Sequence, residues 1–197
     1  MSFNNPAGGH LVFRLARPED SGAMQRALGG IVGRMPHPHW FALLTDEEME
    51  ALTIPPNFSI LAVSTQADCS ADEREGAIAA LICLGTDAPQ PLCADVLRRK
   101  GLEPAHTATL EAVAVQEGAR GQGLQNHLTR LAEERLVKQG IRAVIATAHP
   151  DNLFSVDNLL RAGFRVLDRA ELYGGQPRLV LYKDLSGEST RPDTSQG

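Results

Sequence analysis

A glycine-rich segment, Gly118-Ala119-Arg120-Gly121-Gln122-Gly123, separates an apolar stretch from a long stretch with helical periodicity. The first backbone N–H groups of a helix have no partner inside the helix and carry the positive end of its dipole, so they can bind an anion. Glycines let a phosphate approach the main chain because no Cβ stands in the way, and Arg120 adds a cationic donor. The segment therefore predicts a site for a phosphate-bearing ligand; a glycine-rich turn without a ligand is the alternative.

Two common phosphate-binding motifs do not fit this segment. The spacing from Gly118 to Gly123 matches the start of a P-loop, but Leu124 and Gln125 stand where that motif needs Lys and Ser or Thr. The dinucleotide pattern G-x-G-x-x-G also fails, because Asn126 occupies its last position. The residues of this segment therefore exclude a P-loop protein and a protein with the dinucleotide-binding pattern.

Two ionisable side chains are candidates for proton transfer. Glu111 interrupts the apolar run TLEAVAV, and partial burial there is expected to raise its pKa and make it a base that works near neutral pH. The alternative is a glutamate at the rim that only binds or orients a substrate. Tyr173 lies in the turn ELYGG and is a candidate acid or substrate ligand, or else a residue that shapes the turn.

Histidines and a tryptophan are candidates for binding a substrate. His149 ends an apolar strand, where open α/β sheets place functional groups, although it can equally shape the turn. His37, His39 and Trp40 share an irregular loop. The H-x-H spacing suits a metal, but no third ligand stands nearby, so we expect no metal and predict a small-molecule pocket or a dimer contact. Three cysteines without C-x-x-C spacing predict reduced thiols rather than a disulfide framework or a zinc site.

These candidates are positioned by alternating strands and helices. A helix over 121–139 has its apolar residues on one face, Leu124, Leu128, Leu131, Ala132 and Leu136, and Gly140 ends it. Strands are expected at 10–15, 58–63, 77–84, 107–115, 141–148, 164–167 and 179–182, and further helices at 18–30, 45–50, 95–100 and 151–162. In the last helix, the predicted buried residues are Leu153, Val156, Leu159 and Leu160. This alternation predicts an α/β fold around a mixed sheet, with one domain over 10–185 and mobile segments at 1–9 and 186–197.

Three groups of residues carry a family resemblance. Val113-Ala114-Val115 followed by Arg120-Gly121-Gln122-Gly123-Leu124 resembles motif A of the GCN5-related N-acetyltransferases (GNAT), whose loop is R/Q-x-x-G-x-G/A; Gln125 departs from the final small residue. The run LARPED at 15–20 is similar to the first strand and helix entry of the family, and Asn152, Ser155, Leu159 and Gly163-Phe164 follow its N-x-x-A/S…G-F signature. The resemblance covers residues 10–185.

The resemblance implies a mixed, mostly antiparallel central sheet, splayed into a V between the fourth and fifth strands, with helices on both faces. It implies acetyl-CoA as the acyl donor. The pantetheine arm would pair with the main chain of Val113, Ala114 and Val115. The pyrophosphate would lie on the amides of Arg120-Gly121-Gln122-Gly123-Leu124-Gln125, and Asn152 and Ser155 would contact the cofactor.

The implied activity is transfer of an acetyl group to a primary amine of a small molecule or peptide by direct attack. Glu111 would be the base, often through a water. The usual acid of the family, a tyrosine seven residues after the helix asparagine, is Leu159 here, so Tyr173 or solvent would protonate the leaving thiolate. His39, Trp40 and His149 would border the acceptor pocket. A catalytically weak acyl-CoA-binding sensor and a plain interaction domain are the alternatives.

Composition limits the partners. The net charge of −5 disfavours a nucleic-acid surface, and no stretch approaches the ~20 apolar residues of a membrane span. The first residues do not resemble a secretory signal. We therefore expect a cytoplasmic protein whose partners are acetyl-CoA and an amine, without nucleic acid or membrane; the resemblance adds a homodimer as the common arrangement of the family.

Overall fold

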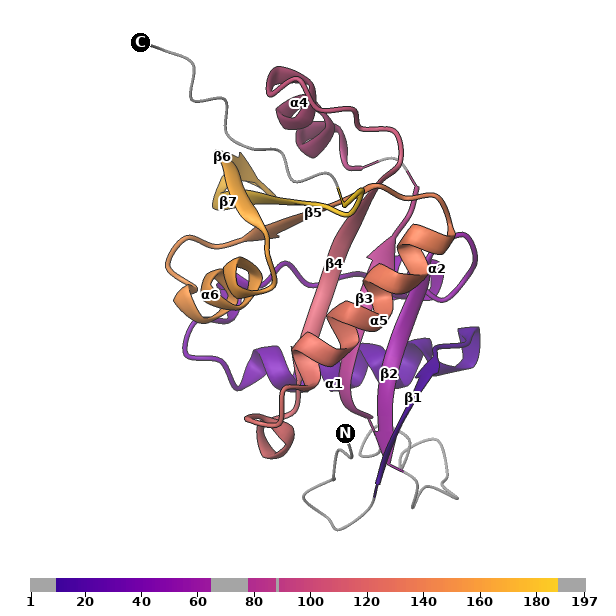
Figure 1. Ribbon diagram of the computed structural model, residues 1–197. Coiled ribbons are helices and arrows are strands. Elements are labelled where there is room, and N and C mark those ends of the chain that lie inside the picture. Colours follow the sequence, from indigo (N-terminus) through magenta and orange to yellow (C-terminus); the bar gives the residue numbers. More distant parts are fainter. Residues whose placement is uncertain (1–9, 65–77, 88, 188–197) are drawn as a thin grey trace.

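The fold is described by a computed structural model over residues 10–64, 78–87 and 89–187 (Figure 1). Cys69, residues 1–9 and residues 188–197 lie outside the described part, so the expected mobility of the two ends stays a prediction. The strands are β1 (Leu11–Leu15), β2 (Phe58–Ser64), β3 (Ile78–Gly85), β4 (Thr107–Val115), β5 (Ala143–Ala148), β6 (Arg165–Leu172) and β7 (Gln176–Asp184). The α-helices are α1 (Ser21–Gly33), α2 (Asp46–Ala51), α4 (Pro91–Arg99), α5 (Leu124–Lys138) and α6 (Leu153–Arg161). Short 3-10 turns are η1 (Pro18–Asp20), η2 (Pro38–Trp40) and η3 (Glu117–Ala119).

The strands form one mixed sheet in the order β1-β2-β3-β4-β5-β7-β6. Only β4 and β5 pair in parallel; the other described neighbours are antiparallel. The parallel pairing runs from Thr107↔Ala143 to Leu110↔Ala146 and then ends, although both strands continue. Figure 1 shows β5 turning away from β4 beyond this point. The predicted mixed, mostly antiparallel sheet with a V between its fourth and fifth strands is confirmed.

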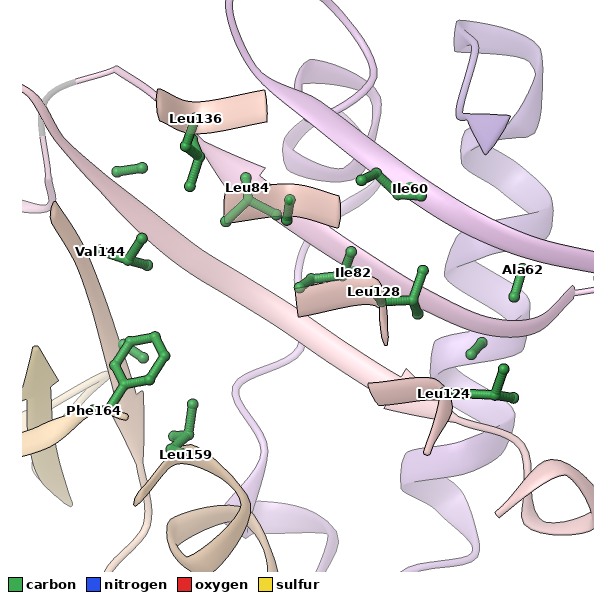
Figure 2. Packing of buried hydrophobic residues seen from close by; sticks show 14 of the residues in the cluster. Ile60, Ala62, Ile82, Leu84, Leu124, Leu128, Leu136, Val144, Leu159 and Phe164 are labelled. Atoms are coloured by element: carbon green, nitrogen blue, oxygen red, sulfur yellow. The ribbon is translucent and has the colours of Figure 1, made fainter. Parts of the chain in front are cut away.

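Helices α5 and α1 cover opposite faces of the sheet (Figure 1). Successive residues of a strand point to opposite faces, and β2 follows this rule: Ile60 packs in the cluster under α5, whereas Leu61 packs with α1. Figure 2 shows Leu124 and Leu128 of α5 among the apolar side chains of the strands. The predicted apolar face of this helix is therefore its contact with the sheet.

The short helix α4 covers the part of the sheet formed by β5 and β7. Its buried Cys93, Val96 and Leu97 pack with Val180 and with four further apolar residues, Ala143, Ile145, Leu172 and Tyr182. The helix starts at Pro91, earlier than predicted, because a proline is well suited to the first helical position. It ends at Arg99, two residues before Gly101.

Several predicted boundaries were wrong. Helix α1 continues through two glycines to Gly33, because Ile31 and Val32 are buried and their packing outweighs the weak helix propensity of glycine. Strands β6 and β7 are longer than predicted because they pair as a hairpin. In α6 only part of the predicted face is buried: Leu153 and Leu160 are 68% and 43% exposed. No described helix is long and apolar enough to cross a membrane.

Candidate functional site

The site is built around the edge of β4 that faces the V. Beyond Leu110 this edge has no partner strand in the described part of the chain, whereas the other edge stays paired with β3 through Ile82↔Val113, Leu81↔Ala114 and Ala80↔Val115. Backbone N–H and C=O groups need hydrogen-bond partners when water is excluded. An extended ligand lying in the V can supply them, as an added strand does at a sheet edge.

Glu111 occupies an irregularity in the pairing of β4 with β3. Cys83 pairs with Ala112 and Leu84 with Leu110, so Glu111 is the extra residue of a β-bulge. Its carboxylate lies over Gly85: a Cβ at that glycine would be 3.1 Å from Glu111 Oε1. The bulge and the absent side chain together leave room for a carboxylate inside the sheet at the mouth of the V.

The surroundings of Glu111 raise its pKa. Burial disfavours the charged carboxylate, and the nearby charge of Glu48 acts in the same direction. Glu48 is held in place by a capping box at the start of α2, in which Thr45 N donates to Glu48 Oε2 (2.7 Å) and Glu48 N donates to Thr45 Oγ1 (3.2 Å). The predicted direction of the Glu111 pKa shift is confirmed.

The glycine-rich segment leads into the N-terminus of α5. The helix begins at Leu124, later than predicted, because Gly121 and Gly123 have φ of 80° and 77°, a left-handed conformation that glycine adopts without strain. No side chain in the described part of the chain caps this end, and the first backbone bond is His127 N to Gly123 O at 3.0 Å. A Cβ on either glycine would meet nothing within 4 Å. An uncapped helix end thus faces open space, and Arg120 is exposed beside it, with Nε 3.4 Å from Val115 O.

Asn152 and Ser155 are in contact with each other at the start of α6. Asn152 is buried and its Oδ1 accepts a hydrogen bond from Ser155 N at 3.2 Å, which caps the helix. Farther along α6, Asn158 Nδ2 donates to Oε1 of Gln125 at 3.2 Å, so this departure from the motif joins α5 to α6. The side-chain oxygen Oδ1 of Asn152 therefore has a structural role, and the side-chain nitrogen Nδ2 is the group left for a ligand.

Tyr173 is in the tight turn between β6 and β7. Its φ is +51°, a left-handed conformation that is uncommon for a residue with a side chain. The phenol oxygen is 3.3 Å from the hydroxyl of Thr147 on β5. Burial raises the pKa of Tyr173, and the charge of the Glu111 carboxylate adds to the increase. The two predicted proton-transfer groups are therefore close enough to influence each other.

The predicted substrate-binding residues form one aromatic cluster. The Trp40 indole is stacked on the His149 ring, with centroids 5.6 Å apart and planes at 19°, and His39 is edge-on to His149 at 6.0 Å. His37 contacts Trp40 at 4.3 Å. His149 is 6% exposed, and burial lowers its pKa. Its Nδ1 accepts from Asp151 N at 3.2 Å. The loop that holds η2 and the end of β5 are thus brought together.

Arg178 was not identified from the sequence. It is 3% exposed, its Nη1 donates to Trp40 O at 2.7 Å, and its guanidinium lies over the Tyr173 ring, 5.4 Å from the centroid. The only available signal is that it is the cation next to the apolar run 179–182. An arginine at the end of a strand ordinarily reaches solvent, so the pattern does not reveal burial.

The described cysteines are free thiols in the interior. Burial raises the pKa of Cys83 to about 12 and that of Cys93 to about 11, so both are protonated and unreactive near neutral pH. Across the described ranges, no group of three or more His, Cys, Asp or Glu side chains could hold a metal ion. The chemistry that this site offers is therefore proton transfer, binding of an extended ligand by main-chain groups, and binding of an anion at a helix terminus.

Comparisons with known proteins agree with this geometry. The acetyltransferase (GNAT) family matches residues 34–164, well over half of the chain. A GNAT-family acetyltransferase from Streptococcus pneumoniae superposes with a TM-score of 0.62 at 20% identity, over 88% of this chain and 98% of its own. A GNAT acetyltransferase from Listeria monocytogenes gives 0.64 at 13%, over 93% and 99%.

A third structure, that of yncA from Salmonella typhimurium with its cofactor acetyl-CoA, gives a TM-score of 0.60 at 15% identity, over 93% and 98% of the two chains. These structures share the fold, and no curated protein matches the chain significantly. The family match covers η2 to α6, which includes the bulged strand, the glycine-rich segment and the helix capped by Asn152. The chain therefore belongs to the GNAT family of acetyltransferases.

Proposed function

We propose that this protein transfers an acetyl group from acetyl-CoA to a primary amine of a small molecule or peptide by direct attack. The observation that carries the proposal is the unpaired edge of β4, which leads directly to the uncapped N-terminus of α5. One ligand that has both an extended amide-bearing arm and a pyrophosphate matches the two features at once. Coenzyme A has this composition, and a structure of similar fold is described with acetyl-CoA.

The residues present fit acetyl-CoA. Amides of 121–125 would hold the pyrophosphate, because Gly121 and Gly123 leave open space where a Cβ would otherwise stand. The main chain of 113–115 would pair with the pantetheine amides. Arg120 would supply a charged contact from the exposed side of the loop, and Asn152 an amide donor from α6. When bound, the cofactor supplies an acetyl group activated as a thioester.

Glu111 is proposed to prepare the amine. A protonated amine cannot attack a carbonyl, so a base has to remove one proton first. The raised pKa of Glu111 keeps its carboxylate a stronger proton acceptor than an exposed glutamate, and it acts directly or through one water. An N–H of the main chain near Val115 would stabilise the negative charge that develops on the thioester oxygen.

Tyr173 is proposed to return a proton to the leaving thiolate as the carbon–sulfur bond breaks and the new amide bond forms. The phenol is protonated at neutral pH, as an acid has to be, because a tyrosine ordinarily has a pKa of about 10 and partial burial raises the pKa of Tyr173 further. Its hydroxyl lies 3.3 Å from that of Thr147. Leu159, at the position of the usual tyrosine, is buried in the core under α5 and α6 and has no ionisable group. Thiolates are fair leaving groups, so we expect loss of the Tyr173 hydroxyl to slow the reaction without abolishing it.

Two measurements test the proposal. Calorimetry with coenzyme A should detect binding to the wild-type chain, and release of free thiol from acetyl-CoA should accelerate when a panel of primary amines is added. Binding without turnover on any amine would support a sensor instead of an enzyme. Absence of binding would refute the proposed site as a whole.

A further inference from the structure

Arg178 carries a buried positive charge that no carboxylate neutralises among the described residues. The only hydrogen bond of its guanidinium there is Nη1 to the carbonyl oxygen of Trp40, and the buried Nε has no partner. An arginine side chain has five N–H donors. Buried charges are costly unless they are paired and hydrogen-bonded. The buried Nε is thus a donor without an acceptor among the described residues.

The surrounding charges do not compensate for Arg178. Arg178 pairs with Ala170 across the ladder, so both point to the same face of the hairpin, and the adjacent Arg169 and Glu171 belong to the opposite face. Both are exposed. Burial is the main cause of the lowered pKa of His149; the carboxylate of Asp151 opposes it, and the charges of Arg178 and of the neighbouring histidines act in the same direction as burial.

Arg178 also lines a pocket. The pocket has a volume of about 190 Å³ and is bordered by Pro150, Arg169, Ala170, Glu171, Pro177 and Arg178. Pro150 follows His149 at the end of β5, and the guanidinium lies over the Tyr173 ring. Arg169, Glu171 and Pro177 border this pocket from the face of the hairpin opposite to the Arg178 side chain. The pocket therefore adjoins Arg178, and the guanidinium itself lies on the side of Tyr173.

We propose that Arg178 binds an acidic group of the acceptor, so that the preferred substrate is an amine that also carries a carboxylate or an equivalent phosphonate. The inference rests on the proposed function, which it makes more specific. A carboxylate can accept two parallel bonds from one edge of a guanidinium. Nη1 already donates to Trp40 O, so the acidic group would accept from the N–H groups that this bond leaves free. The acidic group would thereby set the position of the amine relative to Glu111 and Tyr173.

A purely structural role is the competing explanation. Arg178 joins β7 to the η2 loop across 138 positions of sequence, and this bond contributes to holding Trp40 in place. The two roles make different predictions. A structural clamp affects every acceptor equally, whereas an anion-binding arginine affects only acceptors that carry the acidic group.

Matched pairs of acceptors separate the two roles. Each amine is assayed as its free acid, its phosphonate and its uncharged carboxamide, with wild type and Arg178→Gln. We expect kcat/KM of the wild type for the acid to exceed that for the carboxamide at least tenfold. In Arg178→Gln this ratio should fall to about one, while kcat/KM for the carboxamide changes no more than a few-fold. A higher kcat/KM for the phosphonate than for the carboxylate would also support binding of an acidic group by Arg178, and it would identify the phosphonate as the preferred group.

Arg165→Gln is the matched control. Arg165 lies on the neighbouring strand β6 with its guanidinium 5.3 Å from the centroid of the Tyr182 ring, so the variant also removes an arginine stacked on a tyrosine, but one that does not line the pocket. It should keep the wild-type ratio. Arg178→Lys retains the charge without the two-donor edge and should recover part of the preference.

The failure of this inference can be told apart from failure of the proposed function. Equal kcat/KM of the wild type for acid and carboxamide, or an equal loss on both in Arg178→Gln, overturns the inference and leaves acetyl transfer intact. If no amine is acetylated, calorimetry with the free acids on coenzyme A-treated protein decides: binding that Arg178→Gln abolishes supports the anion site. Absence of binding refutes it, whatever the coenzyme A titration shows.

Discussion

Replacement of Gly123 by alanine tests the anion site at the start of α5. Gly123 has φ of 77°, and the Cβ of an alanine there would point into open space. The left-handed conformation costs an alanine about 1–2 kcal/mol. For a chain of this size, each 1 kcal/mol lowers the melting temperature by roughly 2–4 °C. Backbone strain alone therefore predicts a modestly lower melting temperature. If coenzyme A bound away from Gly123, its affinity should not change.

The effect on cofactor binding should be larger. If the pyrophosphate lies on these amides, the new methyl group holds it away from at least one N–H. A hydrogen bond to a charged group contributes about 1.5–3 kcal/mol, and about 1.4 kcal/mol corresponds to a tenfold change in Kd. We therefore expect Gly123→Ala to weaken binding of coenzyme A by about 10- to 100-fold.

Gly140→Ala is the control, and calorimetry is the assay. Gly140 follows the other end of α5, has φ of 81°, and also has nothing within 4 Å of an added Cβ. The two variants carry the same backbone strain and should have similar melting temperatures. An equal Kd for coenzyme A in both variants would refute the assignment of the pyrophosphate to the glycine-rich segment.

Three further changes test the rest of the site and its scaffold. Glu111→Gln should lower kcat/KM at neutral pH by roughly 10²–10⁴. Since a base works only when deprotonated, wild-type activity should fall as the pH drops through the raised pKa of Glu111. If the pH–rate profile of the variant still shows this fall at acidic pH, the base role is rejected. Leu128→Ala, at a fully buried position of α5, should cost about 2–5 kcal/mol in the free energy of unfolding, measured with urea. Leu159→Tyr restores the usual tyrosine but adds a hydroxyl to a buried site, so we expect it to lose about 1–3 kcal/mol of stability and to gain no turnover; a faster enzyme would contradict the proposed use of Tyr173.

Local sequence patterns were sufficient to predict the helices that position the main-chain groups of the candidate site. The apolar spacing of α5 and the capping box at Thr45 are short-range features, and each has the structure that its pattern predicts. The cap at Asn152 belongs to the same class. These elements were predictable because the interactions that form them join residues three or four positions apart.

Exposure and element length were less predictable. Leu153 and Leu160 fit an apolar helix face but remain exposed, because the part of α6 that contacts the sheet is narrower than its apolar pattern. Helix α1 passes through Gly29 and Gly30 because of packing against the sheet, which no local rule contains. In both cases the neighbouring surface determined the outcome.

The sequence by itself determined the glycine-rich segment ahead of α5, the single carboxylate in the apolar run of β4 and the order of the elements, since these depend on residue type and short spacing. Only the tertiary structure decided that the pairing of β4 and β5 ends at Leu110, and that Glu111, Tyr173 and the stacked Trp40 and His149 belong to one region. It also revealed Arg178 as a buried charge that no carboxylate of the described ranges neutralises. The burial and the pairing of this charge depend on residues up to 138 positions apart in the chain, so the local periodicity of the sequence cannot predict them.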